Sequence, residues 1–135
     1  MSAVGALTPV IWPSPVGADV EVVSAGPSHA VTTVEISPEE QVFAGHYPGF
    51  PIFPGVCVVE CVVRSARLVP AAPGLRLAAV ESTRFSTPVF PGDTLTIELD
   101  WQADGPDWRC RAEVCTARGP AAQVRLRYET GEDRC

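Results

Sequence analysis

One segment limits the possible folds of this chain more than any other, the apolar stretch at residues 54–68 (PGVCVVECVVRSARL). Proline is tolerated at the first position of a helix, so Pro54 is expected near its start, and Pro70 marks its end. The stretch is apolar on nearly every side, which predicts a buried helix. Valine is a weak helix former, so burial rather than intrinsic propensity must hold this helix.

The rest of the chain predicts β-structure around that helix. Residues 94–101 and 109–114 alternate polar and apolar side chains, the pattern of strands with one wet and one dry face. Two β-branched runs precede the helix and four follow it, separated by Gly- and Pro-rich turns. The predicted strands are 18–25, 29–37, 76–85, 94–101, 108–117 and 122–129.

This order of elements predicts an α+β fold, with an antiparallel sheet wrapped around one central buried helix. A chain of 135 residues is expected to form a single domain spanning 1–135. Residues 1–18 are rich in proline and glycine and are interpreted as an irregular lead-in. Residues 130–135 are interpreted as a frayed tail.

Composition excludes several classes of function. The net charge is −6 and all basic residues are arginine, so nucleic acid is not expected as a partner. No apolar run approaches the ~20 residues of a membrane span, and no basic, apolar leader begins the chain. We therefore expect no membrane association and a cytoplasmic location. The five cysteines form no metal-ligand pattern, so no metal is expected and the thiols are interpreted as reduced.

Two ionisable side chains occupy apolar surroundings. His46 lies in an apolar loop at residues 43–55, which is rich in proline and glycine, and Glu60 lies in the middle of the predicted helix. Desolvation raises the pKa of a glutamate and makes it a general acid near neutral pH, where histidine is the natural base. The simpler alternatives are a glutamate that pairs with an arginine and a histidine that only packs.

The predicted start of the helix offers a third element. The first backbone N–H groups of a helix, here those of Gly55 and Val56, have no partners within it and carry partial positive charge. They can polarise a thioester carbonyl and make the neighbouring carbon more acidic.

Residues 45–56 (GHYPGFPIFPGV), followed by Glu60, resemble the motif of the β-hydroxyacyl-acyl-carrier-protein dehydratases of fatty acid synthesis. In that family the acid follows the histidine by fourteen positions, as Glu60 follows His46 here. Residues 84–95 (RFSTPVFPGDTL) resemble a second family stretch. The likeness covers residues 43–99 and implies a hot-dog fold.

The resemblance also implies an activity and its partners. It implies the dehydration of (3R)-3-hydroxyacyl-acyl-carrier-protein to a trans-2-enoyl thioester, in fatty acid, polyketide or polyene biosynthesis. It implies a dimer with His46 of one subunit facing Glu60 of the other, and Gly55 binding the thioester oxygen. The substrate arrives on the phosphopantetheine of an acyl carrier protein, and no other cofactor is required. Residues expected to line or modulate the acyl tunnel are Tyr47, Phe50, Phe53, Cys57, Arg64 and Phe85.

The sequence departs from the family pattern in three places. Arg64 stands where the family commonly has glutamine, and a pairing with Glu60 would lower the pKa of that acid. Residues 1–18 lack the family's usual N-terminal helix, and Cys57 and Cys61 alter the expected tunnel lining. An acidic carrier protein would need a local arginine patch, for which the candidates are Arg84, Arg109 and Arg111.

Two alternatives remain open on the sequence. A hot-dog acyl thioesterase could use Glu60 to attack the substrate or to activate water, because one fold supports both activities. A non-catalytic subunit could complete a heterodimer with an active partner. A hydratase of the Asp-x-x-x-x-His type is excluded, because residue 41 is glutamine.

Overall fold

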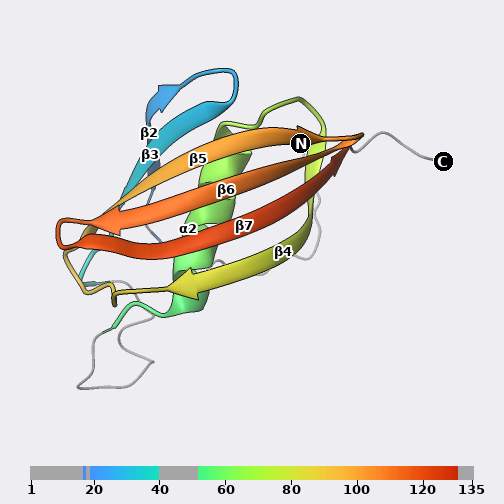
Figure 1. Ribbon diagram of the computed structural model, residues 1–135. Coiled ribbons are helices and arrows are strands. Elements are labelled where there is room, and N and C mark those ends of the chain that lie inside the picture. The colour runs from blue at the N-terminus through green and yellow to red at the C-terminus, as the bar shows by residue number, and fades with distance from the viewer. Residues whose placement is uncertain (1–16, 18, 40–51, 131–135) are drawn as a thin grey trace.

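The computed structural model describes residues 17, 19–39 and 52–130. Within them, six strands form one antiparallel sheet in the order β2-β3-β5-β6-β7-β4. The helix α2 lies against one face of this sheet (Figure 1). This arrangement confirms the predicted α+β class and the sheet wrapped around a helix. The elements are β2 (Val20–Ala25), β3 (His29–Glu35), α2 (Gly55–Leu68), β4 (Leu75–Phe85), β5 (Thr94–Asp104), β6 (Asp107–Thr116) and β7 (Gly119–Thr130).

The alternation of the sequence sets the two faces of the sheet. Leu95, Ile97 and Leu99 of β5 are fully buried, and the residues between them point to the other face. The register continues the dry face across neighbouring strands, with Ile97 opposite Val114 and Leu99 opposite Ala112. The strands extend further than predicted at the two hairpins, where backbone pairing carries β5, β6 and β7 into their turns. Thr130 was predicted to belong to the frayed tail, but it is the last residue of β7 and pairs with Leu75 of β4.

Helix α2 begins at Gly55, with Pro54 at the N-cap, and ends at Leu68, as predicted. Its buried residues lie toward the sheet and are Cys57, Val58, Cys61, Val62, Ser65 and Ala66. The opposite side is open, since Val56 is 71% exposed and Arg67, three turns further along the same side, is also exposed. The prediction of a helix buried on every side is therefore wrong for the single chain. A single sheet covers only one side of a helix, and the other side needs a further surface.

A buried polar contact joins α2 to the sheet. The hydroxyls of Thr32 on β3 and Ser65 on α2 lie 2.7 Å apart, and both residues are fully buried. Buried hydroxyls are costly unless they are hydrogen-bonded, so each satisfies the other. A hydrogen bond is directional, so this pair fixes how α2 is turned about its axis above the sheet.

Strand β4 forms one edge of the sheet, and β2 forms the other. Strand β4 spans eleven residues, pairs only with β7 among the described strands, and is exposed over most of its length. Its exposed apolar side chains include Leu77, Val80 and Phe85. Long apolar edge strands template pairing with another chain and are rarely left open in monomers. The edge therefore marks a surface that another chain can cover.

Candidate active site

A cavity of about 410 Å³ lies where the start of α2 meets the end of β4. Figure 1 shows the arrowhead of β4 beside the base of the helix. The walls are mainly apolar, which suits an acyl chain better than a charged metabolite. The lining residues are Ile52, Phe53, Gly55, Val58, Phe85, Ser86, Thr87, Pro88, Val89 and Ala121.

Gly55 lies against the half-exposed ring of Phe85. A Cβ atom on Gly55 would lie 2.8 Å from Cζ of Phe85, closer than packed carbon atoms approach. Glycine therefore allows the Phe85 ring to sit against the first turn of α2. The first N–H groups of the helix have no partners within it, and the first turn contains no acid. The positive end of the helix dipole thus lies beside the cavity, and Gly55 lines it. The roles of Gly55 and Val56 in binding the thioester stay predictions.

Phe53 and Val89 form another wall of the cavity. The two residues make an isolated antiparallel bridge, in which Phe53 N donates to Val89 O at 2.7 Å. Phe53 is only 2% exposed and belongs to the core as well as to the cavity wall. The bridge ties the segment before α2 to the turn that follows β4, so both walls have fixed positions.

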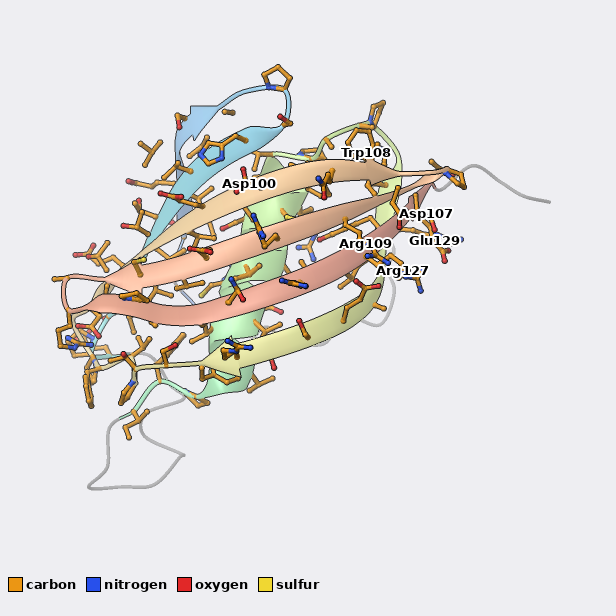
Figure 2. The ribbon with its side chains drawn as sticks, viewed as in Figure 1. Asp100, Asp107, Trp108, Arg109, Arg127 and Glu129 are labelled. Atoms are coloured by element: carbon orange, nitrogen blue, oxygen red, sulfur yellow. The ribbon has the colours of Figure 1, made fainter. Side chains whose placement is uncertain are left out.

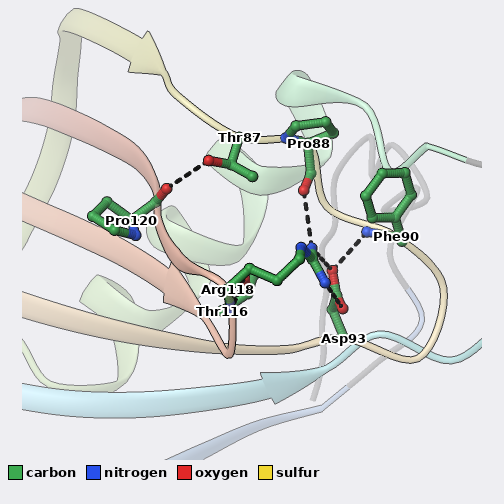
Figure 3. Close-up of polar contacts among 7 residues, drawn as sticks. All are labelled: Thr87, Pro88, Phe90, Asp93, Thr116, Arg118 and Pro120. Atoms are coloured by element: carbon green, nitrogen blue, oxygen red, sulfur yellow. Dashed lines mark hydrogen bonds and ion pairs between the residues drawn. The ribbon is translucent and has the colours of Figure 1, made fainter.

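Arg118 braces the turn that carries this wall, and sequence reasoning missed it (Figure 3). Its guanidinium donates to both carboxylate oxygens of Asp93, at 2.9 and 2.6 Å, and to Pro88 O at 3.1 Å. The Asp93 carboxylate also accepts a hydrogen bond from Phe90 N at 2.7 Å. The hydrogen bond from Arg118 holds the pKa of Asp93 below its ordinary value. A partner twenty-five positions away gives no local signal in the sequence.

A second set of hydrogen bonds ties the same turn to the β6–β7 hairpin. Ser86 N and Thr87 N donate to Ala121 O at 2.8 and 3.3 Å. The Thr87 hydroxyl donates to Pro120 O at 2.9 Å. The cavity wall is therefore attached to a rigid part of the sheet rather than to a loose loop.

Glu60 lies on the open side of α2, facing away from the sheet. It is half-buried, one turn after the exposed Val56 and one turn before the half-buried Arg64. The helical period places Val56, Glu60 and Arg64 along one stripe of the helix. The predicted partner of Glu60, His46, lies outside the described residues, as do Tyr47 and Phe50. The meeting of His46 and Glu60 stays a prediction.

Cys57 faces the sheet rather than the open side of the helix. It is 1% exposed, belongs to the core, and does not line the described cavity at the start of α2. Phe85, by contrast, lines that cavity and is half exposed. Of the predicted tunnel residues that the structure describes, Phe53 and Phe85 thus lie together at the start of α2.

The arginines proposed for partner contact differ in their surroundings. Arg109 lies with Arg127 among acids at one end of the outer sheet face (Figure 2). It contacts Asp104 at 3.1 Å and Glu81 at 3.6 Å, so its charge is already compensated. Arg84 and Arg111 are exposed on β4 and β6 and form no ion pair with the described part of the chain. Those two remain available to an acidic partner.

Comparison with known proteins identifies the class to which this fold and cavity belong. The family model of the ApeI-like proteins, described as ApeI dehydratase, matches residues 23–125. The chain belongs to this family of hot-dog dehydratases. None of the helices in the described ranges is long and apolar enough to span a membrane.

Individual relatives agree with the family. The 3-hydroxyacyl-acyl-carrier-protein dehydratase FabZ of Symbiobacterium thermophilum is 38% identical over 84 residues, covering 57% of this chain and 59% of the relative. The FabZ of Desulforamulus reducens is 31% identical over 104 residues, covering 72% and 73%. The chain spans between 41% and 73% of the length of these curated relatives.

A solved structure shares the fold. The dehydratase heterocomplex ApeI:P from Xenorhabdus doucetiae matches with a TM-score of 0.65 and 23% identity, covering 82% of this chain and 97% of that chain. At this level of identity the likeness concerns the fold alone.

Proposed function

We propose that this chain dehydrates a 3-hydroxyacyl thioester carried on an acyl carrier protein. The observation that carries the proposal is the mainly apolar cavity at the start of α2, which Gly55 lines at the N-terminal end of the helix. Such a site accepts a thioester carbonyl at its polar end and an acyl chain along its walls. Membership of the dehydratase family and the resemblance of residues 45–56 support the same chemistry.

The proposed mechanism uses proton transfers. The thioester oxygen accepts hydrogen bonds at the N-terminus of α2, from Gly55 and Val56, and this makes the α-carbon more acidic. His46 removes the α-proton, and the electron pair forms the double bond to the β-carbon. Glu60 donates a proton to the departing hydroxyl, which leaves as water. The product is a trans-2-enoyl thioester, and these steps require no metal or further cofactor.

The proposed enzyme is a dimer, with a second copy or a related subunit. Strand β4 is an exposed apolar edge, and the open side of α2 carries Glu60 beside exposed apolar residues. A subunit that paired along β4 would cover both surfaces and remove Glu60 from water. It would also supply His46 across the interface, as the family resemblance implies. The ApeI:P heterocomplex favours keeping a related subunit as an alternative to a second copy.

A direct assay tests the activity. The purified protein is mixed with 3-hydroxyacyl carrier proteins of different chain length, and the enoyl product is followed by its absorbance and by intact mass. We expect a loss of water from at least one substrate. The variants His46→Ala and Glu60→Ala should each lose most of this activity, whereas Glu98→Gln, an exposed acid on β5, should retain it.

The same assay separates the alternative functions. Release of free thiol without an enoyl product would indicate a thioesterase. Turnover that appears only after a related subunit is added would indicate a non-catalytic partner. Normal dehydration by both His46→Ala and Glu60→Ala would contradict the assigned roles.

A further inference from the structure

A second cavity, of about 470 Å³, lies at the opposite end of α2 and has the size of a small-molecule site. Its floor is aromatic, because Trp101 and Tyr128 line it and each residue is only 6% exposed. The ring N–H of Trp101 donates to Val69 O at 3.0 Å, and the two aromatic rings pack with their centroids 5.0 Å apart. The floor is therefore fixed in place and suits an apolar group.

The side walls of this second cavity are also largely apolar. Val63 and Ala66 line it from the helix, and Leu75 and Leu77 line it from the exposed edge strand β4. A subunit paired along β4, as proposed above, would enclose these walls further. The cavity therefore offers continuous apolar surface for an alkyl chain.

Arg67 adds a positive charge at the rim of the second cavity. It lines the cavity from the last turn of α2 and is exposed. Its neighbours three and four positions earlier on the helix are Arg64 and Val63, and it forms no ion pair with the described part of the chain. Burial raises the pKa of the Tyr128 phenol, and the charge of Arg67 lowers it in part, so the guanidinium lies toward the cavity.

The second arginine of this cavity already has an acidic neighbour. Arg76 lies 3.8 Å from Glu129, and both side chains are exposed. The charge that is left for a ligand is therefore that of Arg67, which one carboxylate would balance. A phosphate monoester, with nearly two negative charges, would be repelled by Glu129 and by the partial negative charge at the C-terminal end of α2.

We propose that the second cavity binds a medium-chain carboxylate, with the alkyl chain on the aromatic floor and the carboxylate on the Arg67 guanidinium. A guanidinium can donate two parallel hydrogen bonds to a carboxylate, which gives this pair both strength and orientation. The inference goes beyond the proposed dehydration, because it requires neither a thioester nor a reaction. It also differs from stabilisation of the helix dipole, which needs only a positive charge and which lysine would supply equally well.

Binding measurements test this inference on the full chain. The probes are octanoate and 1-octanol, which have equal chain length, and calorimetry measures their affinities. We expect the wild-type protein to prefer octanoate by about tenfold or more, the usual effect of hydrogen bonds to a charged group. Arg67→Gln should abolish this preference, and Arg67→Lys, which keeps the charge but not the paired donors, should retain only part of it. Arg111→Gln removes the same charge from the outer sheet face and should keep the full preference.

Several outcomes would overturn the inference. Equal affinities for octanoate and 1-octanol in the wild-type protein would show that no anion is recognised. A preference that survives Arg67→Gln would place octanoate elsewhere, such as in the cavity at Gly55. Equal losses in Arg67→Gln and Arg111→Gln would reduce the effect to net charge, and tighter binding of octyl phosphate than of octanoate would contradict the choice of a carboxylate. None of these results bears on the dehydration assay, because no thioester is present.

Discussion

The two ends of α2 resemble each other in shape and differ in chemistry. Each end has a mainly apolar cavity of similar size, about 410 Å³ at Gly55 and about 470 Å³ at Tyr128. At the start of the helix the polar groups are backbone N–H groups, which have no partners within the helix. At its end they are charged side chains, because Arg67 and Arg76 line the second cavity with Trp101 and Tyr128.

This difference suggests a division of tasks along one helix. Backbone donors and the helix dipole suit a site where negative charge develops during a reaction. Arginine side chains beside aromatic rings suit recognition of a group that does not react. The protein can therefore place chemistry at one end of α2 and recognition at the other.

Separating the subunits of the proposed dimer should have the largest effect on the two cavities. Val80 lies in the middle of β4 and is 45% exposed. Val80→Lys should place a charge within the paired edge, so that the dimer dissociates and both cavities lose their cover. Because His46 and Glu60 would no longer meet, we expect dehydration to fall by about a hundredfold or more. Analytical ultracentrifugation and the enoyl assay measure the two effects.

The opposite edge of the sheet provides the matched control. Val22 on β2 is similarly exposed, and Val22→Lys should leave both assembly and turnover unchanged. A dimer that survives Val80→Lys would show that β4 is not the interface.

Gly55→Ala should affect the start of α2 alone. The added Cβ would meet the Phe85 ring at 2.8 Å, so the ring must move and the cavity must change shape. Because the Phe85 ring is half exposed, it can move aside at little cost in stability, and we expect the altered cavity to lower dehydration by about tenfold. Adding Phe85→Leu removes the clash, so recovery in the double variant separates this contact from a general failure to fold.

The turn beside the same cavity should weaken in acid. The pKa of Asp93 is lowered from 3.8, mainly by its hydrogen bond with Arg118, so its stabilisation is complete above that value and is lost as pH falls through the lowered pKa. Near neutral pH, Asp93→Asn should destabilise the protein by about 1–3 kcal/mol, and this difference should shrink at low pH. Denaturant unfolding measures it, with the exposed Asp104→Asn as the comparison. A difference that is independent of pH would contradict the ion pair.

The smallest expected effect on stability comes from His29, and its dependence on pH is opposite to that of Asp93. His29 Nδ1 lies 2.7 Å from Asp100 Oδ1, next to Trp101, and the hydrogen bond with Asp100 raises the pKa of His29 above 6.5. Its stabilisation is complete below 6.5 and is lost as pH rises through the raised pKa. Both groups are half exposed, so His29→Gln should matter less than Asp93→Asn. NMR titration of the imidazole checks the direction, and an unchanged or lowered pKa would refute it.

The sequence predicts local structure well because local patterns determine it. Pro54 and Pro70 bracket the helix, and alternation identifies the strands. Contacts between distant residues are invisible to such patterns, which is why the brace between Arg118 and Asp93 was missed. The apolar neighbours of Glu60 indicated a helix buried on every side, but they could not say that the chain's own sheet would cover only one side.

The candidate site was predictable only in part for the same reason. Gly55 was identified from its place at the start of the helix, whereas its contact with Phe85 depends on tertiary packing. Arg109 was a reasonable partner contact on charge alone, and the fold instead surrounds it with Asp104 and Glu81. Tyr128 gave no signal, because a tyrosine in an alternating strand is ordinarily part of the core.

The hydroxyl pair of Thr32 and Ser65 has a consequence for a residue that it never touches. Apolar packing tolerates a small roll of the helix, whereas a hydrogen bond in the dry interior accepts one orientation. The hydrogen bond lies on the side of α2 that faces the sheet, and Glu60 lies on the open side. The rotation that the hydrogen bond fixes therefore also sets the direction in which Glu60 points. Ser65→Ala would remove this hydrogen bond and allow α2 to rotate about its axis. The carboxylate of Glu60 would then change its orientation, although Glu60 and Ser65 lie on opposite sides of the helix.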